Sequence, residues 1–156
     1  MIDATDRVNW LAEAQPVAEQ VASALSGLTF KRHIYAALKK LGFKPFTKKA
    51  EGTSAGIRPR VLGDFVVKSM YVAEEYDAKF CLPTLILGCN GFEPLPDGGK
   101  VSEQNIVLQP LCDNDMRRIT PLWRRDNSPC DELNDFIEAV PNNIGIWKGK
   151  VGLLDW

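Results

Sequence analysis

The sequence predicts an α+β fold, with N-terminal helices and one C-terminal helix packed on a mainly antiparallel sheet. Three observations lead to this class. Apolar residues recur at helical spacing up to Gly42, the pattern shifts toward alternation from Phe43, and helix-start signals return after Asn127. We therefore expect one domain over 1–156, with helices in 1–42, a sheet in 43–127, a helix in 129–140 and a strand with a tail in 144–156.

The first helical segment is expected to begin near Thr5. Its apolar repeat continues through Val21 and Leu25 and stops at the Gly27 turn. Pro16 falls inside this run, and proline is tolerated in the first turn of a helix but not in its interior. The sequence therefore predicts two short helices or one kinked helix here.

The second helix is predicted over 30–41. Ile34 and Leu38 lie on one apolar face, Thr29 is suited to cap the N-terminus, and Gly42 stands where a left-handed C-cap belongs. This segment should be an amphipathic helix.

Short segments rich in β-branched and aromatic residues follow, separated by turn residues. Glu51–Pro59 and Asn90–Lys100 are dense in Gly and Pro and are predicted to be exposed loops. Ser128 and Pro129 mark the start of the helix at 129–140. Candidate strands lie near 43–49, 60–69, 71–80, 83–88, 105–111, 117–123 and 144–147.

The composition, 45% hydrophobic and 25% charged, is that of an ordinary globular protein. No apolar stretch approaches the roughly 20 residues that a bilayer-spanning helix needs, so we expect no membrane partner. The acidic start of the chain differs from the basic and then apolar pattern of a secretory leader. We therefore expect a cytoplasmic location, or a place in an assembly made inside a cell.

The residue types available limit the chemistry. His33 is the only histidine, which excludes mechanisms that need two imidazoles. The four cysteines show no zinc-type spacing, and we interpret them as reduced, mostly buried thiols. They are Cys81, Cys89, Cys112 and Cys130.

Charge is distributed very unevenly along the chain. Residues 28–68 hold ten Lys and Arg against Glu51 and Asp64, although the net charge of the whole protein is only −1. Like charges that crowd together repel unless a partner or an acidic surface offsets them. The segment therefore predicts a basic face that meets a partner.

The basic residues of the 30–41 helix should lie on its exposed side. Lys31 and Arg32 occupy the first turn, where the helix dipole disfavours cations. One interpretation is a phosphate-contacting helix, the second of a helix-turn-helix formed with residues 17–26 and followed by a wing from 43–67. The other is a solvated face paired with acids elsewhere in the fold. The side chains away from the apolar stripe are Lys31, Arg32, Tyr35 and Lys39.

A second constellation contains Asp64, Asp77 and Lys79. On neighbouring strands, two carboxylates and a lysine can hold Mg²⁺ and activate a water against a phosphodiester. With Leu41-Gly42-Phe43, these residues resemble the core of the PD-(D/E)XK nuclease superfamily. The resemblance implies Mg²⁺ as cofactor, Asp64 and Asp77 as metal ligands, and Lys79 as a catalytic residue. The alternative is an exposed strand face with a cross-strand ion pair.

Our leading hypothesis is a non-catalytic interaction or assembly module that needs no cofactor or metal. It would dock through the basic face and the apolar C-terminus, as a subunit of a ring or a virion, against protein subunits that include copies of itself. The alternatives are the nuclease and a non-enzymatic nucleic-acid-binding protein. The predicted partner-binding residues are Lys31, Arg32, Tyr35, Lys39, Lys48, Lys49, Arg58, Arg60 and Trp156.

Overall fold

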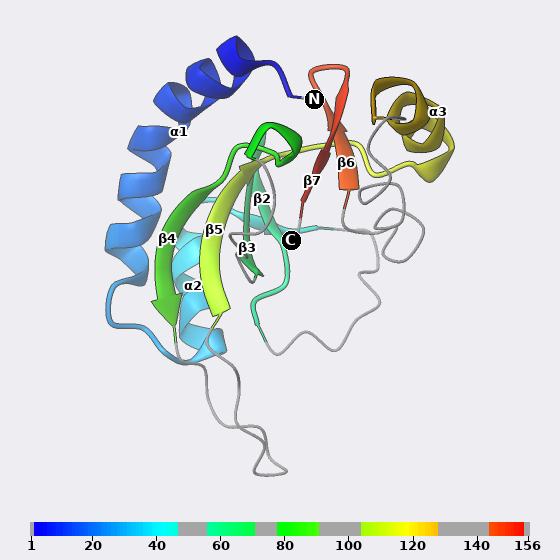
Figure 1. Ribbon diagram of the computed structural model, residues 1–156. Helices are drawn as coiled ribbons and strands as arrows, with labels where there is room; N and C mark the ends of the chain where they lie inside the picture. Colours follow the sequence, from blue (N-terminus) through cyan, green and yellow to red (C-terminus); the bar gives the residue numbers. More distant parts are fainter. Residues whose placement is uncertain (1, 47–55, 71–77, 91–103, 128–143, 155–156) are drawn as a thin grey trace.

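The structure is a computed structural model that describes residues 2–46, 56–70, 78–90, 104–127 and 144–154 (Figure 1). Helices and a mainly antiparallel sheet make up these residues, which confirms the α+β class. The helices are α1 (Ala4–Leu25), α2 (Lys31–Lys40), α3 (Met116–Asn127) and the short 3₁₀ helix η1 (Ala78–Phe80). The strands are β1 (Lys44–Pro45), β2 (Arg60–Leu62), β3 (Phe65–Met70), β4 (Leu85–Asn90), β5 (Gln104–Pro110), β6 (Ile144–Trp147) and β7 (Lys150–Leu153).

A five-stranded antiparallel sheet with the order β1-β2-β3-β5-β4 forms the centre of the fold. β2 and β3 form a hairpin around Gly63 and Asp64, and β3 pairs with β5 from Phe65, opposite Pro110, to Met70, opposite Asn105. The two-stranded hairpin β6–β7 is separate from this sheet. The described residues therefore form two sheets where one was expected.

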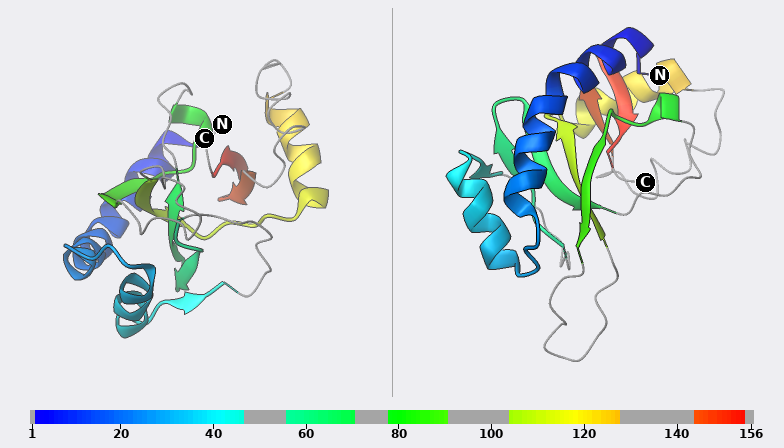
Figure 2. Two further views of the ribbon diagram at one scale, coloured as in Figure 1. Left: turned by 90° about the horizontal axis from the view of Figure 1, so that it is seen from below. Right: turned by 90° about the vertical axis from the view of Figure 1, so that its left-hand side faces the viewer.

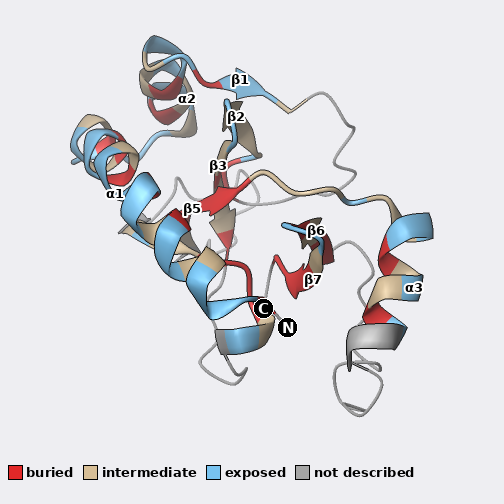
Figure 3. Cartoon of the chain, turned by 90° about the horizontal axis from the view of Figure 1, so that it is seen from above, coloured by how far each residue is buried: buried red, intermediate tan, exposed pale blue. Residues whose placement is uncertain are grey.

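The elements are arranged in layers (Figure 3). α1 and α2 lie on one side of the five-stranded sheet, while the β6–β7 hairpin and then α3 lie on the other. The Trp10 ring of α1 packs 6.1 Å from the Phe65 ring of β3, measured between centroids. Buried apolar residues fill both interfaces, so the central sheet is covered on both faces.

α1 is one curved helix that continues through Pro16 (Figure 1). Of the two predicted alternatives, two separate helices are therefore wrong, and a single helix is observed. Pro16 lies on the exposed side, as does Ala12, whose carbonyl would have accepted the missing hydrogen bond, so water can satisfy it. Asp3 caps the N-terminus, because its carboxylate accepts hydrogen bonds from the backbone N–H groups of Thr5, at 2.8 Å, and Asp6, at 3.2 Å.

α2 confirms the predicted amphipathic helix to within a residue at each end. Its C-terminus is a Schellman motif: Gly42 has a φ of 99°, and the Phe43 N–H donates to the Leu38 carbonyl at 3.0 Å. The predicted Thr29 cap is wrong, since Phe30 holds the N-cap position and makes no side-chain capping bond. The first turn of α2 therefore carries Lys31 and Arg32 without any local acidic residue.

The strand predictions had mixed outcomes. β5 and β6 confirm the strands expected at 105–111 and 144–147, β4 overlaps 83–88, and the segment 60–69 is a hairpin of two strands instead of one. Only Lys44 and Pro45 of 43–49 are paired in the described residues. The strand expected at 71–80 is wrong over its described part, which is η1. The helix expected at 129–140 lies outside the described residues.

The strand expected at 117–123 is also wrong, because these residues belong to α3. The Asp115 carboxylate caps this helix by accepting the Arg117 N–H at 3.0 Å. Ile119 and Trp123, one turn apart, are both fully buried in a cluster that includes residues of the β6–β7 hairpin. α3 thus provides the helix in the C-terminal third of the described chain.

The apolar end of the described chain is buried against the chain itself. Leu153 and Leu154 are both buried, and the Leu154 carbonyl accepts hydrogen bonds from Gln109 Nε2 and from Lys68 Nζ, each at 2.9 Å. These two residues lie on central strands of the sheet, so the bonds fasten the hairpin to it. The apolar C-terminus, which was expected to dock on a partner, is therefore packed on this chain itself as far as Leu154. Trp156 lies outside the described residues.

Candidate cation–aromatic binding face

One stripe of α2 carries a lysine, a tyrosine and a second lysine. Lys31, Tyr35 and Lys39 are four residues apart, so they follow one another along the same side of the helix, next to the buried stripe of Ile34 and Leu38. Lys39 is exposed, whereas Lys31 and Tyr35 are half-buried. In the predicted basic helix, the stripe of Lys31, Tyr35 and Lys39 therefore lies directly beside the residues that α2 buries in the core.

Tyr35 connects this stripe to the segment before β2. Its hydroxyl accepts a hydrogen bond from the Arg58 backbone N–H at 3.0 Å. The guanidinium carbon of Arg60 lies 4.1 Å from the centre of the Tyr35 ring, within the range of a cation–π interaction. Arg58 and Arg60, which follow Tyr35 by 23 and 25 positions in the sequence, thus lie at the surface of α2.

The segment before β2 is held in place from the sheet side. Ile57 is buried, and its N–H donates to Ser69 Oγ of β3 at 2.8 Å. Arg60 pairs with Val67 of β3, and its guanidinium also donates to the Pro59 carbonyl at 3.2 Å. The guanidinium of Arg60 is therefore oriented by a strand, a carbonyl and an aromatic ring.

A second aromatic ring lies at the start of α2. Phe30 is 40% exposed, with the guanidinium carbon of Arg32 5.2 Å from its ring centre and the His33 ring 5.5 Å away in an edge-on orientation. An aromatic ring with a nearby guanidinium is a frequent feature of binding surfaces. Both groups belong to α2 and to the segment that contacts Tyr35, and we name them together the cation–aromatic face. Its members are Phe30, Lys31, Arg32, Tyr35, Lys39, Arg58 and Arg60.

The cation–aromatic face has one sign of charge. In the part of the chain that the structure describes, no carboxylate lies within ion-pair distance of its five cations. Ion pairs instead join Asp113 and Asp115 to Arg117 and Arg118, at the start of α3. The interpretation of a solvated face paired with acids elsewhere is thus not supported by the described residues.

Six of the nine predicted partner-binding residues belong to the cation–aromatic face. Lys48, Lys49 and Trp156 lie outside the described residues. Phe30 was missed as a binding residue, because its position in the helical repeat suggested that it belongs to the core. Phe30 precedes the first turn of α2 and lies outside the buried stripe of the helix. This position was the signal that its side chain could be exposed.

The nuclease resemblance is not supported by the arrangement of the strands. Asp64 lies in the turn between β2 and β3, and Lys79 lies in η1, which contacts β7 and is not a strand of the central sheet. Among the described strands, β3 pairs with β2 and β5. Asp77 lies outside the described residues. No group of three or more side chains that could hold a metal ion occurs among the described ones.

The helix-turn-helix interpretation also differs from the observed geometry. α1 and α2 run side by side in opposite directions (Figures 1 and 2), whereas helix-turn-helix motifs have two steeply crossed helices. β2 and β3 lie inside the five-stranded sheet, between β1 and β5, instead of forming a free wing. A contact with nucleic acid would therefore use a different surface geometry from that of a recognition helix in a groove.

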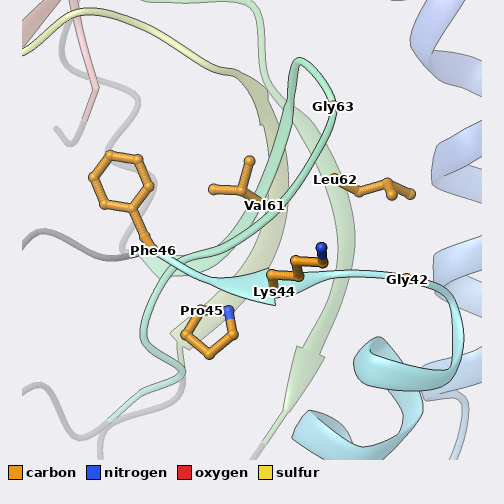
Figure 4. A pocket seen from close by; sticks show the side chains of 7 residues that line it. All are labelled: Gly42, Lys44, Pro45, Phe46, Val61, Leu62 and Gly63. Carbon is orange, nitrogen blue, oxygen red and sulfur yellow. The ribbon is translucent and has the colours of Figure 1, made fainter.

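An open pocket of about 400 Å³ lies beside β1 and β2 (Figure 4). Its walls are mainly apolar side chains and backbone, and Lys44 is the one charged residue among those that line it. None of the described residues that line it has an acidic, imidazole or hydroxyl side chain. The lining residues are Gly42, Lys44, Pro45, Phe46, Val61, Leu62 and Gly63.

Comparisons with models of known protein families, with curated proteins and with solved structures find no match to this chain. Among the described helices, none has both the length and the hydropathy to cross a bilayer. The fold and the face thus define an α+β domain with a cationic, aromatic surface.

Proposed function

We propose that this chain is a non-catalytic interaction module that docks on an acidic macromolecular surface through its cation–aromatic face. We place it inside a cell, as a subunit of a larger assembly such as a ring or a virion. The observation that carries this proposal is the position of Arg60 over the Tyr35 ring, in a surface whose cations form no ion pair with a carboxylate of the described residues.

Two physical arguments support docking. Unpaired cations of one sign repel one another, and an acidic partner relieves that repulsion while it increases the rate of association. Tyr and Arg are also the residue types that most often anchor macromolecular interfaces. Because Arg60 is already oriented by Tyr35 and by the Pro59 carbonyl, less side-chain entropy is lost when it binds.

Retention on heparin–agarose tests the proposal, because heparin is a simple polyanion. The wild type should be retained and should elute at a defined salt concentration. The double variant Arg32→Gln with Arg58→Gln should elute at clearly lower salt, because two cations of the face are lost.

A matched control removes the same charge elsewhere. Arg124→Gln with Lys148→Gln changes two exposed cations, on α3 and on the β6–β7 turn, and should elute with the wild type. If both double variants shift equally, the binding depends on net charge alone, and the proposed face is wrong. A wild type that passes through the column unretained would also contradict the proposal.

A further inference from the structure

We infer that the acidic partner of the cation–aromatic face is single-stranded nucleic acid, which contributes phosphates to the cations and unpaired bases to the exposed aromatic ring. This inference rests on the proposed function and specifies its partner.

The composition of the face favours nucleic acid over a protein partner. Stable protein–protein interfaces have an apolar centre from which charged residues are depleted. Here a guanidinium lies beside each of the two rings, Arg32 at Phe30 and Arg60 at Tyr35, and the face has three further cations. Phe30 is the one large exposed apolar side chain that the described part of the face contributes. Protein–nucleic acid interfaces are more polar and much more positive than protein–protein interfaces, and this is the composition observed.

The aromatic groups favour a single strand over a duplex. The exposed ring of Phe30 can stack on a base only if that base is unpaired and can turn out of its own stack. The guanidinium of Arg60, stacked on Tyr35, offers a second planar surface of the kind on which bases also stack. A duplex would meet the cations with its phosphates but would leave Phe30 without a partner.

The α2 stripe of Lys31, Tyr35 and Lys39 sets the length over which a strand can bind. Lys31 and Lys39 mark the two ends of the α2 stripe, about 12 Å apart along the helix axis from the helical rise. Tyr35 is midway between them in the stripe, and it contacts the Arg60 guanidinium and the Arg58 backbone N–H. This length corresponds to a few nucleotides, comparable to the smallest sites of single-strand-binding modules.

Fluorescence anisotropy separates the candidate partners. The probes are a labelled oligo-dT of about 16 nucleotides, a duplex of the same length, and a poly-glutamate peptide of similar charge. The oligo-dT should bind most tightly, and its affinity should fall steeply as salt rises. Phe30→Ala should weaken oligo-dT binding about tenfold, since stacking on one aromatic ring is lost, and Phe30→Trp should preserve it.

Each other outcome overturns the inference in an identifiable way. Equal affinity for duplex and oligo-dT, with no effect of Phe30→Ala, would show phosphate binding without base stacking. Binding of poly-glutamate peptide but not oligo-dT would reject nucleic acid yet leave the proposed function intact. Light scattering tests a second copy as the partner. If the wild type self-associates, the double variant Arg32→Gln with Arg58→Gln is monomeric, and oligo-dT does not bind, the face belongs to a contact between two copies. Failure to bind oligo-dT, peptide and heparin would reject both proposals.

Discussion

The side-chain nitrogen Nε2 of Gln109 lies 2.9 Å from the carbonyl oxygen of Leu154, and this hydrogen bond joins the central sheet to the end of the C-terminal hairpin. Gln109 is 1% exposed, and its Nε2 also donates to Thr84 Oγ1 at 2.9 Å. The NH2 group of this buried amide therefore has two acceptors, and each acceptor loses one hydrogen bond if the amide is removed. This residue therefore fastens two parts of the fold together.

Gln109→Leu should lower the free energy of unfolding by about 1–3 kcal/mol, because buried acceptors lose a hydrogen bond while the volume stays similar. Urea unfolding followed by circular dichroism measures the change. The matched control is Gln20→Leu on the exposed side of α1, which should change stability by less than about 0.5 kcal/mol. Equal stabilities of the two variants would show that the Gln109 bonds contribute nothing.

Gly145→Ala should destabilise the β6–β7 hairpin. A Cβ at Gly145 would overlap Cys112 Sγ and would lie 3.1 Å from Cys112 Cβ, and such overpacking costs about 1–3 kcal/mol. In a Cys112→Ala background, the same substitution should cost less, because the overlapping sulfur is absent. An unchanged cost in the two backgrounds, measured by urea unfolding, would contradict this explanation.

Asp115 should make stability depend on pH in the acid range. Hydrogen bonds from Arg117 lower the pKa of the Asp115 carboxyl to about 2. A lowered pKa means that this carboxylate stabilises the fold above about pH 4, and that its contribution is lost as the pH falls toward about 2. Asp115→Asn keeps a capping side chain but removes the charge, so its stability should fall less over this range.

Urea midpoints measured across the acid range test this prediction. The control Glu13→Gln removes an exposed carboxylate on α1 and should retain the pH dependence of the wild type. The interpretation of Asp115 fails if Asp115→Asn and the wild type lose stability in parallel.

Cys112 should react slowly with iodoacetamide in the folded protein. Burial raises the pKa of this thiol from its usual value near 9 to about 11, and Asp113 adds to the effect, although Lys68 opposes it. The thiolate is the nucleophile, so about a hundredfold less of it is present at mildly alkaline pH. Mass spectrometry of the Cys112 peptide, with and without urea, measures the rate. Equal rates in both conditions would contradict the prediction.

The N-terminal half of the fold could be predicted well because its signals are local. The apolar repeat of α2 and the glycine after it determine that helix within one segment, and Gly42 forms the C-cap that its position indicated. For α1 the sequence left two alternatives open at Pro16, two short helices or one kinked helix, and a single helix is observed. The rule against proline in a helix interior does not account for an exposed position where water replaces the missing partner.

α3 could not be recognised from β-propensity. Ile119, Thr120 and Trp123 are typical strand residues, yet Ile119 and Trp123 are one helical turn apart and both are buried next to the β6–β7 hairpin. Packing against a hairpin more than twenty residues later in the chain decides the helix here. The Asp115 cap was the local signal that would have favoured it.

The candidate site was predictable as a set of residues but not as a surface. The charge count and the helical spacing of 30–41 together identified Lys31, Arg32 and Lys39, because these residues belong to one dense basic segment and lie away from the apolar stripe. The contact of Tyr35 with Arg58 and Arg60 depends on β2 lying beside α2, and no local pattern specifies that neighbour. Long-range pairing thus turns a basic segment into an ordered cation–aromatic face.

Hydrogen–deuterium exchange of the wild type with and without saturating oligo-dT tests the central claim most directly. We predict slower exchange in peptides from 30–40 and 57–62, with little change in peptides from 116–127, because the cation–aromatic face lies on α2 and beside β2. Protection confined to 116–127 or 144–154, or no protection despite binding, would contradict the assignment of the binding surface to this face.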